Sequence, residues 1–168
     1  MNKVTKSLVV MVLLVAMGTV AFGQENIKDI VEQEGLSWMI GQWKASMDDG
    51  AEILLTYRWA VKGYAIVSNF KMGDNTSQGI IYFVADEQQV RQLTVDSRGQ
   101  AFAATWEVQD GKAITKTKMI DEYGEATDVG IAYSKVDDTT IKVAIHGLDN
   151  GELSDSSMFE INFKKEKK

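Results

Sequence analysis

The chain has no cysteine and no proline, and its only histidine is His146. Without cysteine it has no disulfide, no thiolate metal ligand and no cysteine for lipidation. A catalytic zinc usually takes three protein ligands rich in histidine or cysteine, so a single histidine argues against that chemistry as well. The chain has no X-Pro bond whose slow isomerisation could limit folding. We therefore predict no metal site and no resident cofactor.

Long apolar runs are missing too, apart from one of 13 residues at positions 8–20. That run is shorter than the roughly 20 residues that a membrane-spanning helix needs. Lys3 and Lys6 precede it, and Ala21-Phe22-Gly23 follows as a cleavage region. This pattern predicts a secretory signal peptide over residues 1–23, cut near Gly23, with a retained signal anchor as the alternative. We expect a periplasmic or secreted protein that has no membrane span after cleavage.

Basic residues are few, and the charge of the chain is acidic. The formal net charge is −6, and loss of Lys3 and Lys6 with the signal peptide changes it to −8. An acidic chain lacks the positive surface that binds phosphates, so nucleic acid is not an expected partner. The length of 168 residues and the apolar content of 45% suit one domain with a full core.

A short helix is expected at 24–35, because Ile27, Ile30 and Val31 recur at helical spacing before Gly35. From Trp38 onward the period changes to two, and residues 36–168 are expected to form the β-barrel domain. Ile53, Leu55, Tyr57 and Trp59, for example, alternate with more polar residues, which is typical of a strand with one buried face.

Nine evenly spaced turn signals divide this region into ten strands, and no gap is long enough for a crossover helix. We predict strands at 37–48, 51–61, 64–72, 76–85, 90–96, 101–109, 112–120, 126–135, 139–147 and 156–164. One-sided strands hide their apolar face and their edges by closing into a barrel. The predicted fold is therefore all-β, an antiparallel up-and-down barrel of about ten strands with a short N-terminal helix.

Two other β architectures share part of this pattern. An outer-membrane barrel would place Lys112, Lys116 or Lys118 against lipid, at a cost of about 2–4 kcal/mol each near the midplane. A half-open sheet with a helical lid, as in periplasmic lipoprotein carriers, fits almost as well as a closed barrel.

An ordered set of motifs runs through the chain. It consists of Trp38, Gly41-Gln42-Trp43, Tyr57-x-Trp59, Lys62-Gly63, Arg91, Asp96-Ser97-x-Gly99 and Trp106. This set resembles an uncharacterised bacterial lipocalin-like (calycin-like) β-barrel domain, and more distantly the nitrobindin-type barrels. The resemblance implies a barrel whose end is plugged by Trp43, with a basic residue near the last strand, Lys164 or Lys165, stacked over the ring. It implies no established activity.

The alternation also predicts which side chains face the barrel interior. The expected ligand-binding residues are Arg91, which shares a face with Leu93 and Val95, and the aromatic residues Tyr57, Trp59, Tyr64, Trp106 and Tyr133. Apolar and aromatic walls with a few polar groups are typical of a small-molecule site. Arg91 would pair there with a carboxylate or another anionic head.

We therefore expect non-catalytic binding of a small apolar or amphiphilic molecule. A structural or protein-interaction module with a filled core is the first alternative, with an exposed apolar patch near Ala65 and Val67. The second is a haem-binding or isomerase barrel, for which His146 is the only possible histidine ligand.

We expect no catalytic residues. Ser156 or Ser157, His146 and Asp155 supply the residue types of a triad, but no nucleophile-elbow motif surrounds the serines. The acidic groups Asp48-Asp49, Asp121-Glu122 with Glu125, and Asp137-Asp138 all fall at predicted turns, where aspartate is favoured. No group matches the spacing of an EF-hand loop.

Overall fold

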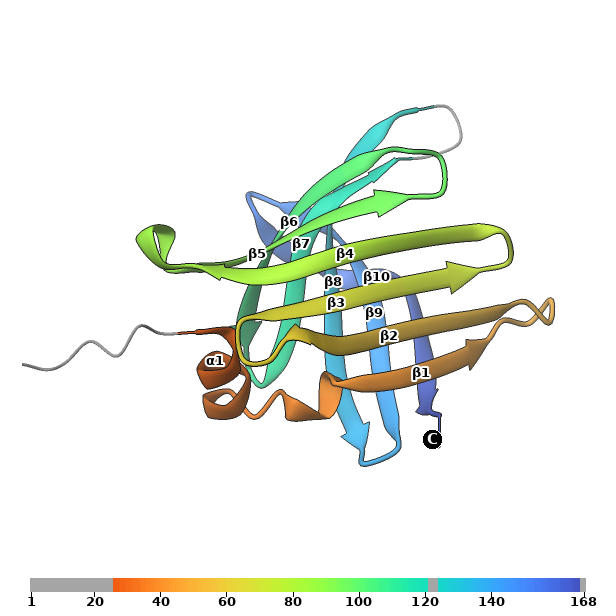
Figure 1. Ribbon diagram of the computed structural model, residues 1–168. Coiled ribbons are helices and arrows are strands. Elements are labelled where there is room, and N and C mark those ends of the chain that lie inside the picture. The colour runs from red at the N-terminus through yellow and green to blue at the C-terminus, as the bar shows by residue number, and fades with distance from the viewer. Residues whose placement is uncertain (1–25, 121–123, 167–168) are drawn as a thin grey trace, which may run out of the picture.

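The computed structural model describes residues 26–120 and 124–166, which form a closed barrel of ten antiparallel strands with one short helix (Figure 1). The predicted signal peptide, residues 24 and 25 of the predicted helix, and Asp121 and Glu122 lie outside the described residues. The helices are α1 (Ile27–Gln33) and the short 3₁₀ turns η1 (Ser37–Met39) and η2 (Ala85–Glu87). The strands are β1 (Gly41–Ser46), β2 (Glu52–Val61), β3 (Ala65–Met72), β4 (Asn75–Val84), β5 (Gln89–Asp96), β6 (Ala101–Gln109), β7 (Lys112–Ile120), β8 (Ala126–Asp137), β9 (Thr140–Asp149) and β10 (Glu152–Lys165).

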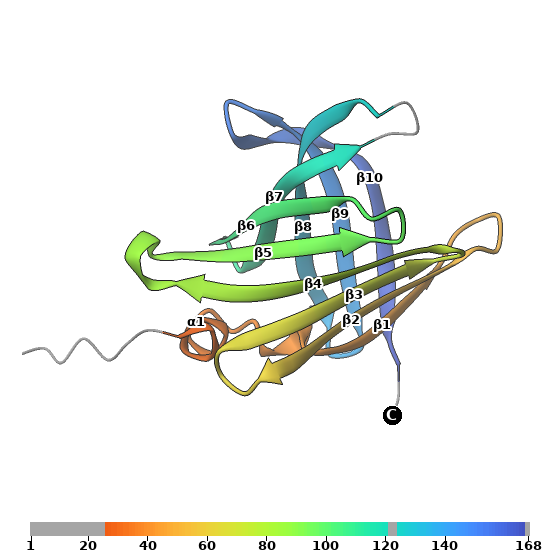
Figure 2. The ribbon, with the colours of Figure 1, turned by 45° about the horizontal axis from the view of Figure 1, so that its top comes forward.

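Every strand pairs with its neighbour in the chain, and β1 closes the barrel against β10. Trp43 lies opposite Lys165 and Lys44 opposite Lys164, and the Glu166 N–H donates to the Gln42 carbonyl at 2.9 Å. Figure 2 shows β10 returning beside β1. The closed barrel was the expected fold, and this seam excludes the half-open sheet among the described residues.

Eight strands agree with the predicted ranges to within two residues, and the first and last do not. Residues 37–39 form η1 instead of the start of β1, with the Met39 N–H donating to the Leu36 carbonyl at 2.9 Å. This turn presents the Met39 carbonyl to the indole N–H of Trp43, at 3.1 Å. The last strand begins at Glu152 and contains register shifts between Leu153 and Phe159, which the sequence pattern did not show.

Helix α1 covers one end of the barrel, as its apolar stripe predicted (Figure 1). It begins after Asn26, whose side-chain oxygen accepts from the N–H groups of Lys28 and Asp29. Ile27 and Val31 are buried, and the Lys28 N–H donates to the Gly63 carbonyl in the β2–β3 turn at 3.1 Å. No helix among the described residues is long and apolar enough to cross a bilayer.

The Trp43 signature closes the same part of the core. Trp43 is 1% exposed, and the Lys165 ammonium lies 5.1 Å from its ring centroid, so the prediction of a lysine stacked over this tryptophan is confirmed. Gly41 has φ of +153°, and a Cβ there would lie 3.2 Å from Cε of Lys165. Glycine therefore suits both the backbone and the close passage of the lysine. Trp38 lies in η1 and packs against the core, partly buried.

The predicted orientation of β5 is wrong. Leu93 and Val95 are 48% and 49% exposed, so the face they share with Arg91 points outward. The reason is the length of the β5–β6 loop. A two-residue loop at Arg98-Gly99 would place Arg91 opposite Trp106, but the Asp96 N–H donates to the Gln100 carbonyl at 3.0 Å, which makes a three-residue loop. Val90 then lies opposite Trp106, and this one-residue shift reverses both faces of the strand.

Candidate functional site

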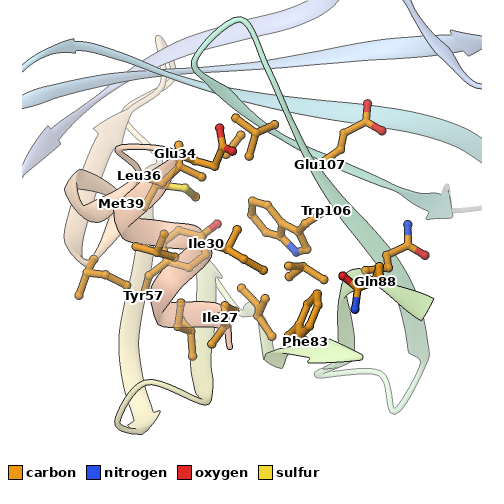
Figure 3. A pocket seen from close by; sticks show the side chains of 18 residues that line it. Ile27, Ile30, Glu34, Leu36, Met39, Tyr57, Phe83, Gln88, Trp106 and Glu107 are labelled. Atoms are coloured by element: carbon orange, nitrogen blue, oxygen red, sulfur yellow. The ribbon is translucent and has the colours of Figure 1, made fainter. Parts of the chain in front are cut away.

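The barrel interior beneath α1 contains a cavity of about 380 Å³, which we call the α1 pocket (Figure 3). Only four of the 18 residues that line it are polar. The apolar and aromatic ones are Ile27, Ile30, Val31, Leu36, Met39, Ile40, Tyr57, Ile66, Ile81, Phe83, Val90, Trp106, Val108 and Ala113. A cavity of this size and composition is typical of a small-molecule site.

Both the helix and the barrel wall build this pocket. Helix α1 contributes Ile27, Ile30 and Val31, which are the residues of its predicted apolar stripe. Figure 3 shows Trp106 of β6 opposite Ile30, with Phe83 of β4 beside the ring. The Lys28 to Gly63 bond and the burial of Ile27 and Val31 hold α1 against the barrel, so the helix forms a fixed wall of the pocket.

A layer of three aromatic rings borders the pocket on the side away from α1. Tyr57 meets Trp106 edge-on at 6.4 Å between ring centroids and Tyr133 edge-on at 6.2 Å, and Trp106 stacks on Tyr133 at 5.4 Å. These separations are those of favourable aromatic pairs. The sequence predicted that these three residues face inward together, and the structure confirms it.

A second cavity of about 220 Å³, here called the far chamber, lies beyond this aromatic layer and is more polar. Gln92 organises it. Its amide nitrogen donates to Oγ of Ser68 at 3.1 Å and to Oγ1 of Thr94 at 2.7 Å, and its amide oxygen accepts from the Trp106 indole at 2.8 Å. Gln92 thus fixes the orientation of the Trp106 ring, which belongs to the aromatic layer and lines the α1 pocket.

Burial changes the acidity of both tyrosines in this layer. It raises the pKa of Tyr57 well above 10, and the neighbouring Tyr133 raises it further. Burial also raises the pKa of Tyr133. Both phenols are therefore neutral at physiological pH, because a buried phenolate would lose its hydration.

The polar side chains around the α1 pocket carry negative charge or none. They are Glu34, Gln88, Gln89 and Glu107. The Glu107 carboxylate pairs with the Lys116 ammonium at 2.8 Å, while no ion pair among the described residues involves Glu34. None of the described residues that line this pocket is a lysine, an arginine or a histidine.

Three other predicted site residues lie away from both cavities. Trp59 packs against the core, partly buried, but lines neither cavity. Tyr64, predicted to face inward, is 64% exposed in the β2–β3 turn, because β3 begins only at Ala65. Arg91 forms an ion pair with Glu87 outside the barrel, as the reversal of β5 requires. The predicted pairing of Arg91 with an anionic ligand inside the barrel is therefore wrong.

The structure bears on both alternatives to ligand binding. His146 lines neither cavity and its Nδ1 lies 2.9 Å from the Ser154 carbonyl, so a haem held by this histidine inside the barrel has no support. Within the described residues no group of three histidine or acidic side chains is arranged to hold a metal.

The two cavities show that the interior is not completely filled. Of the two residues named for the apolar patch of the interaction alternative, Ala65 is buried, whereas Val67 is half-buried and lies opposite Ile80. Ile80 is exposed, as is its partner on β5, Leu93.

Sequence reasoning missed Glu34, Gln92 and Gly79, a glycine of β4 that lies against the side chains of Gln92, Ser68 and Thr94. Gln92 and Gly79 were missed because a polar side chain and a glycine in a strand do not look like parts of an interior. The pairing of β5 with β6 was the available signal, because a three-residue loop places Gln92 on the same face as Trp106. Glu34 follows the helix whose apolar stripe was recognised, and only the folded position of that helix brings it to the pocket.

Comparison with protein-family models and with curated protein sequences finds no match to this chain.

Proposed function

We propose that this barrel binds a small apolar or amphiphilic molecule in the α1 pocket and does not transform it. The observation that carries the proposal is the preformed apolar cavity of about 380 Å³ between α1 and the barrel wall. Burial of a ligand's apolar surface there supplies about 25 cal/mol per Å² before the costs of association. The lipocalin-like resemblance of the Gly41-x-Trp43 region is consistent with a binding role.

The size of the cavity limits the ligand. An apolar cavity of about 150 Å³ holds a benzene molecule, so 380 Å³ accommodates roughly ten to fifteen non-hydrogen atoms. A decyl chain or a bicyclic ring system falls in this range. We also propose a periplasmic or secreted location, on the pattern of residues 1–23.

Native mass spectrometry of protein purified from its own compartment tests this proposal, with denatured protein as the control. A discrete excess mass that is lost on denaturation is the expected result. Decanol then serves as a defined probe, with its affinity measured by calorimetry for two variants of one strand. Val90→Phe narrows the pocket and is expected to weaken binding, whereas Val95→Phe adds the same ring on the exposed face. An apo mass, together with no decanol binding to the unmodified protein, would refute the proposal.

A further inference from the structure

We infer that the ligand of the α1 pocket carries a neutral or cationic head, not an anionic one, and that Glu34 is the group that faces this head. This inference rests on the proposed function. It specifies the chemical class of the ligand: an alcohol or a primary amine on an apolar chain or ring, as opposed to a fatty acid.

The charged groups that line the α1 pocket are negative. Among the described residues that line it, the two acids are Glu34 and Glu107, whereas Gln88, Gln89 and the phenol of Tyr57 are uncharged. A carboxylate head at this site would meet like charge and no cation among these residues. Like-charge contacts at a binding site act against the wrong ligand, so the lining selects against acids.

The existing ion pairs show which acid is available. Glu107 is already paired with Lys116 at 2.8 Å, and Arg91, the cation that the sequence predicted for the interior, pairs with Glu87 outside the barrel. Glu34 takes part in none of the ion pairs formed among the described residues. A protonated amine at the rim would give this carboxylate a partner, in a charge-assisted hydrogen bond.

Glu34 places a negative charge beside the cavity. It directly follows α1, and its N–H donates to the carbonyl of Ile30 at 2.9 Å, so the two residues belong to the same helical turn. Ile30 lines the pocket together with Glu34, and Figure 3 shows both on the α1 side of the cavity. Glu34 is exposed, which places its carboxylate at the rim. A head beside Glu34 therefore directs the attached chain past Ile30 toward Trp106.

Three probes with one decyl chain separate the head from the cavity. They are decylamine, which is protonated at pH 7, decanol, and decanoate, which is ionised. Calorimetry at low salt is expected to give decylamine an affinity at least about tenfold higher than decanoate, with decanol between them. The difference should shrink in 0.5 M salt, because screening weakens interactions of charges at an exposed rim.

Two substitutions on the same helical segment supply the matched comparison. Glu34→Gln is expected to bring the amine and the acid to within about threefold of each other. Glu32→Gln removes an equal charge that pairs with Lys28 and does not line the pocket, so it should preserve the preference. Circular dichroism of each variant verifies that α1 and the barrel are intact.

The outcomes distinguish this inference from the proposed function. Decanol binding with no preference between amine and acid, or with a preference for the acid, overturns the inference and leaves the apolar pocket as the binding site. The same is true if Glu32→Gln removes the preference as fully as Glu34→Gln. Failure of all three probes to bind overturns both.

Discussion

Gly79 lies at the centre of the polar network in the far chamber, and its replacement by alanine tests how tightly that network is packed. An added Cβ would lie 2.5 Å from Oγ1 of Thr94 and 2.8 Å from both Nε2 of Gln92 and Oγ of Ser68. Real Cβ atoms do not make such contacts, so the Gln92 side chain must move. Gly79→Ala is therefore expected to disconnect Gln92 from its partners, including Trp106.

The expected loss of stability can be worked out from the hydrogen bonds that Gln92 would lose. Gln92 makes three of them, to Ser68, Thr94 and Trp106, and a typical hydrogen bond contributes about 0.5–1.5 kcal/mol net. Replacing a strand glycine by alanine gains roughly 0.5–1 kcal/mol in compensation. We expect Gly79→Ala to lower the free energy of unfolding by about 0.5–4 kcal/mol. Urea denaturation followed by far-UV circular dichroism measures the change, and Trp106 emission should shift because its indole N–H loses its acceptor.

Gly147 supplies the matched control, since it is also a strand glycine. A Cβ there meets nothing closer than Oγ of Ser154, at 3.8 Å. Gly147→Ala should leave stability unchanged or raise it by up to about 1 kcal/mol. If Gly79→Ala is as stable as the unmodified protein, or if it costs as much in a Gln92→Ala background as in the original one, the packing argument is refuted.

Two further predictions concern the closed end of the barrel and the aromatic layer. Trp43→Phe should lower the free energy of unfolding by about 1–3 kcal/mol in chemical denaturation, because it leaves a void and deprives the Met39 carbonyl of its indole donor. Lys165→Met should cost no more than about 1 kcal/mol, as the loss of one exposed cation–π contact; an equal loss in both variants would contradict this assignment. Tyr57 has a folded-state pKa above its unfolded value of about 10. Above pH 10 the tyrosine therefore ionises first in the unfolded state, which lowers the free energy of unfolding as pH rises. Denaturation midpoints at pH 9 and 11 should therefore fall less in Tyr57→Phe than in the unmodified protein, and an equal fall would show that Tyr57 does not cause the alkaline loss.

The fold could be predicted because its determinants are local. Turn residues such as Asn150-Gly151 and Asp110-Gly111 adopt the positive φ angles that their residue types favour, and they punctuate the chain at short, regular intervals. With no room for a crossover helix, neighbouring strands had to be antiparallel, and closure followed from the need to hide edges. The predicted first strand began four residues too early, because Ser37–Met39 form η1, whose closing bond to the Leu36 carbonyl cannot be seen in the pattern of apolar residues.

The candidate site could be predicted only in part, since it depends on relations between distant segments. Tyr57, Trp106 and Tyr133 were assigned inward because large aromatic residues on an alternating strand favour the interior. The role of α1 as a cover was expected, but the acidic residue that follows it gained meaning only from its position beside Ile30. No local pattern gives the distance between residue 34 and strand β6.

The reversal of β5 has a more general cause. Period-two alternation separates two faces of a strand, and hydrophobicity then decides which face is buried. That choice fails when the interior is itself polar. In β5 the inner residues Gln92 and Thr94 serve the far chamber, while Leu93 and Val95 remain on the outer wall. The register of the β5–β6 hairpin is the stronger guide, because a paired residue shares the face of its partner whatever its polarity. Gly99, whose φ is +79°, is the residue that marks the three-residue loop. With that loop, Val90 pairs with Trp106. Because Trp106 was predicted to face inward, this register would have placed Val90 inside the barrel and Arg91 outside it.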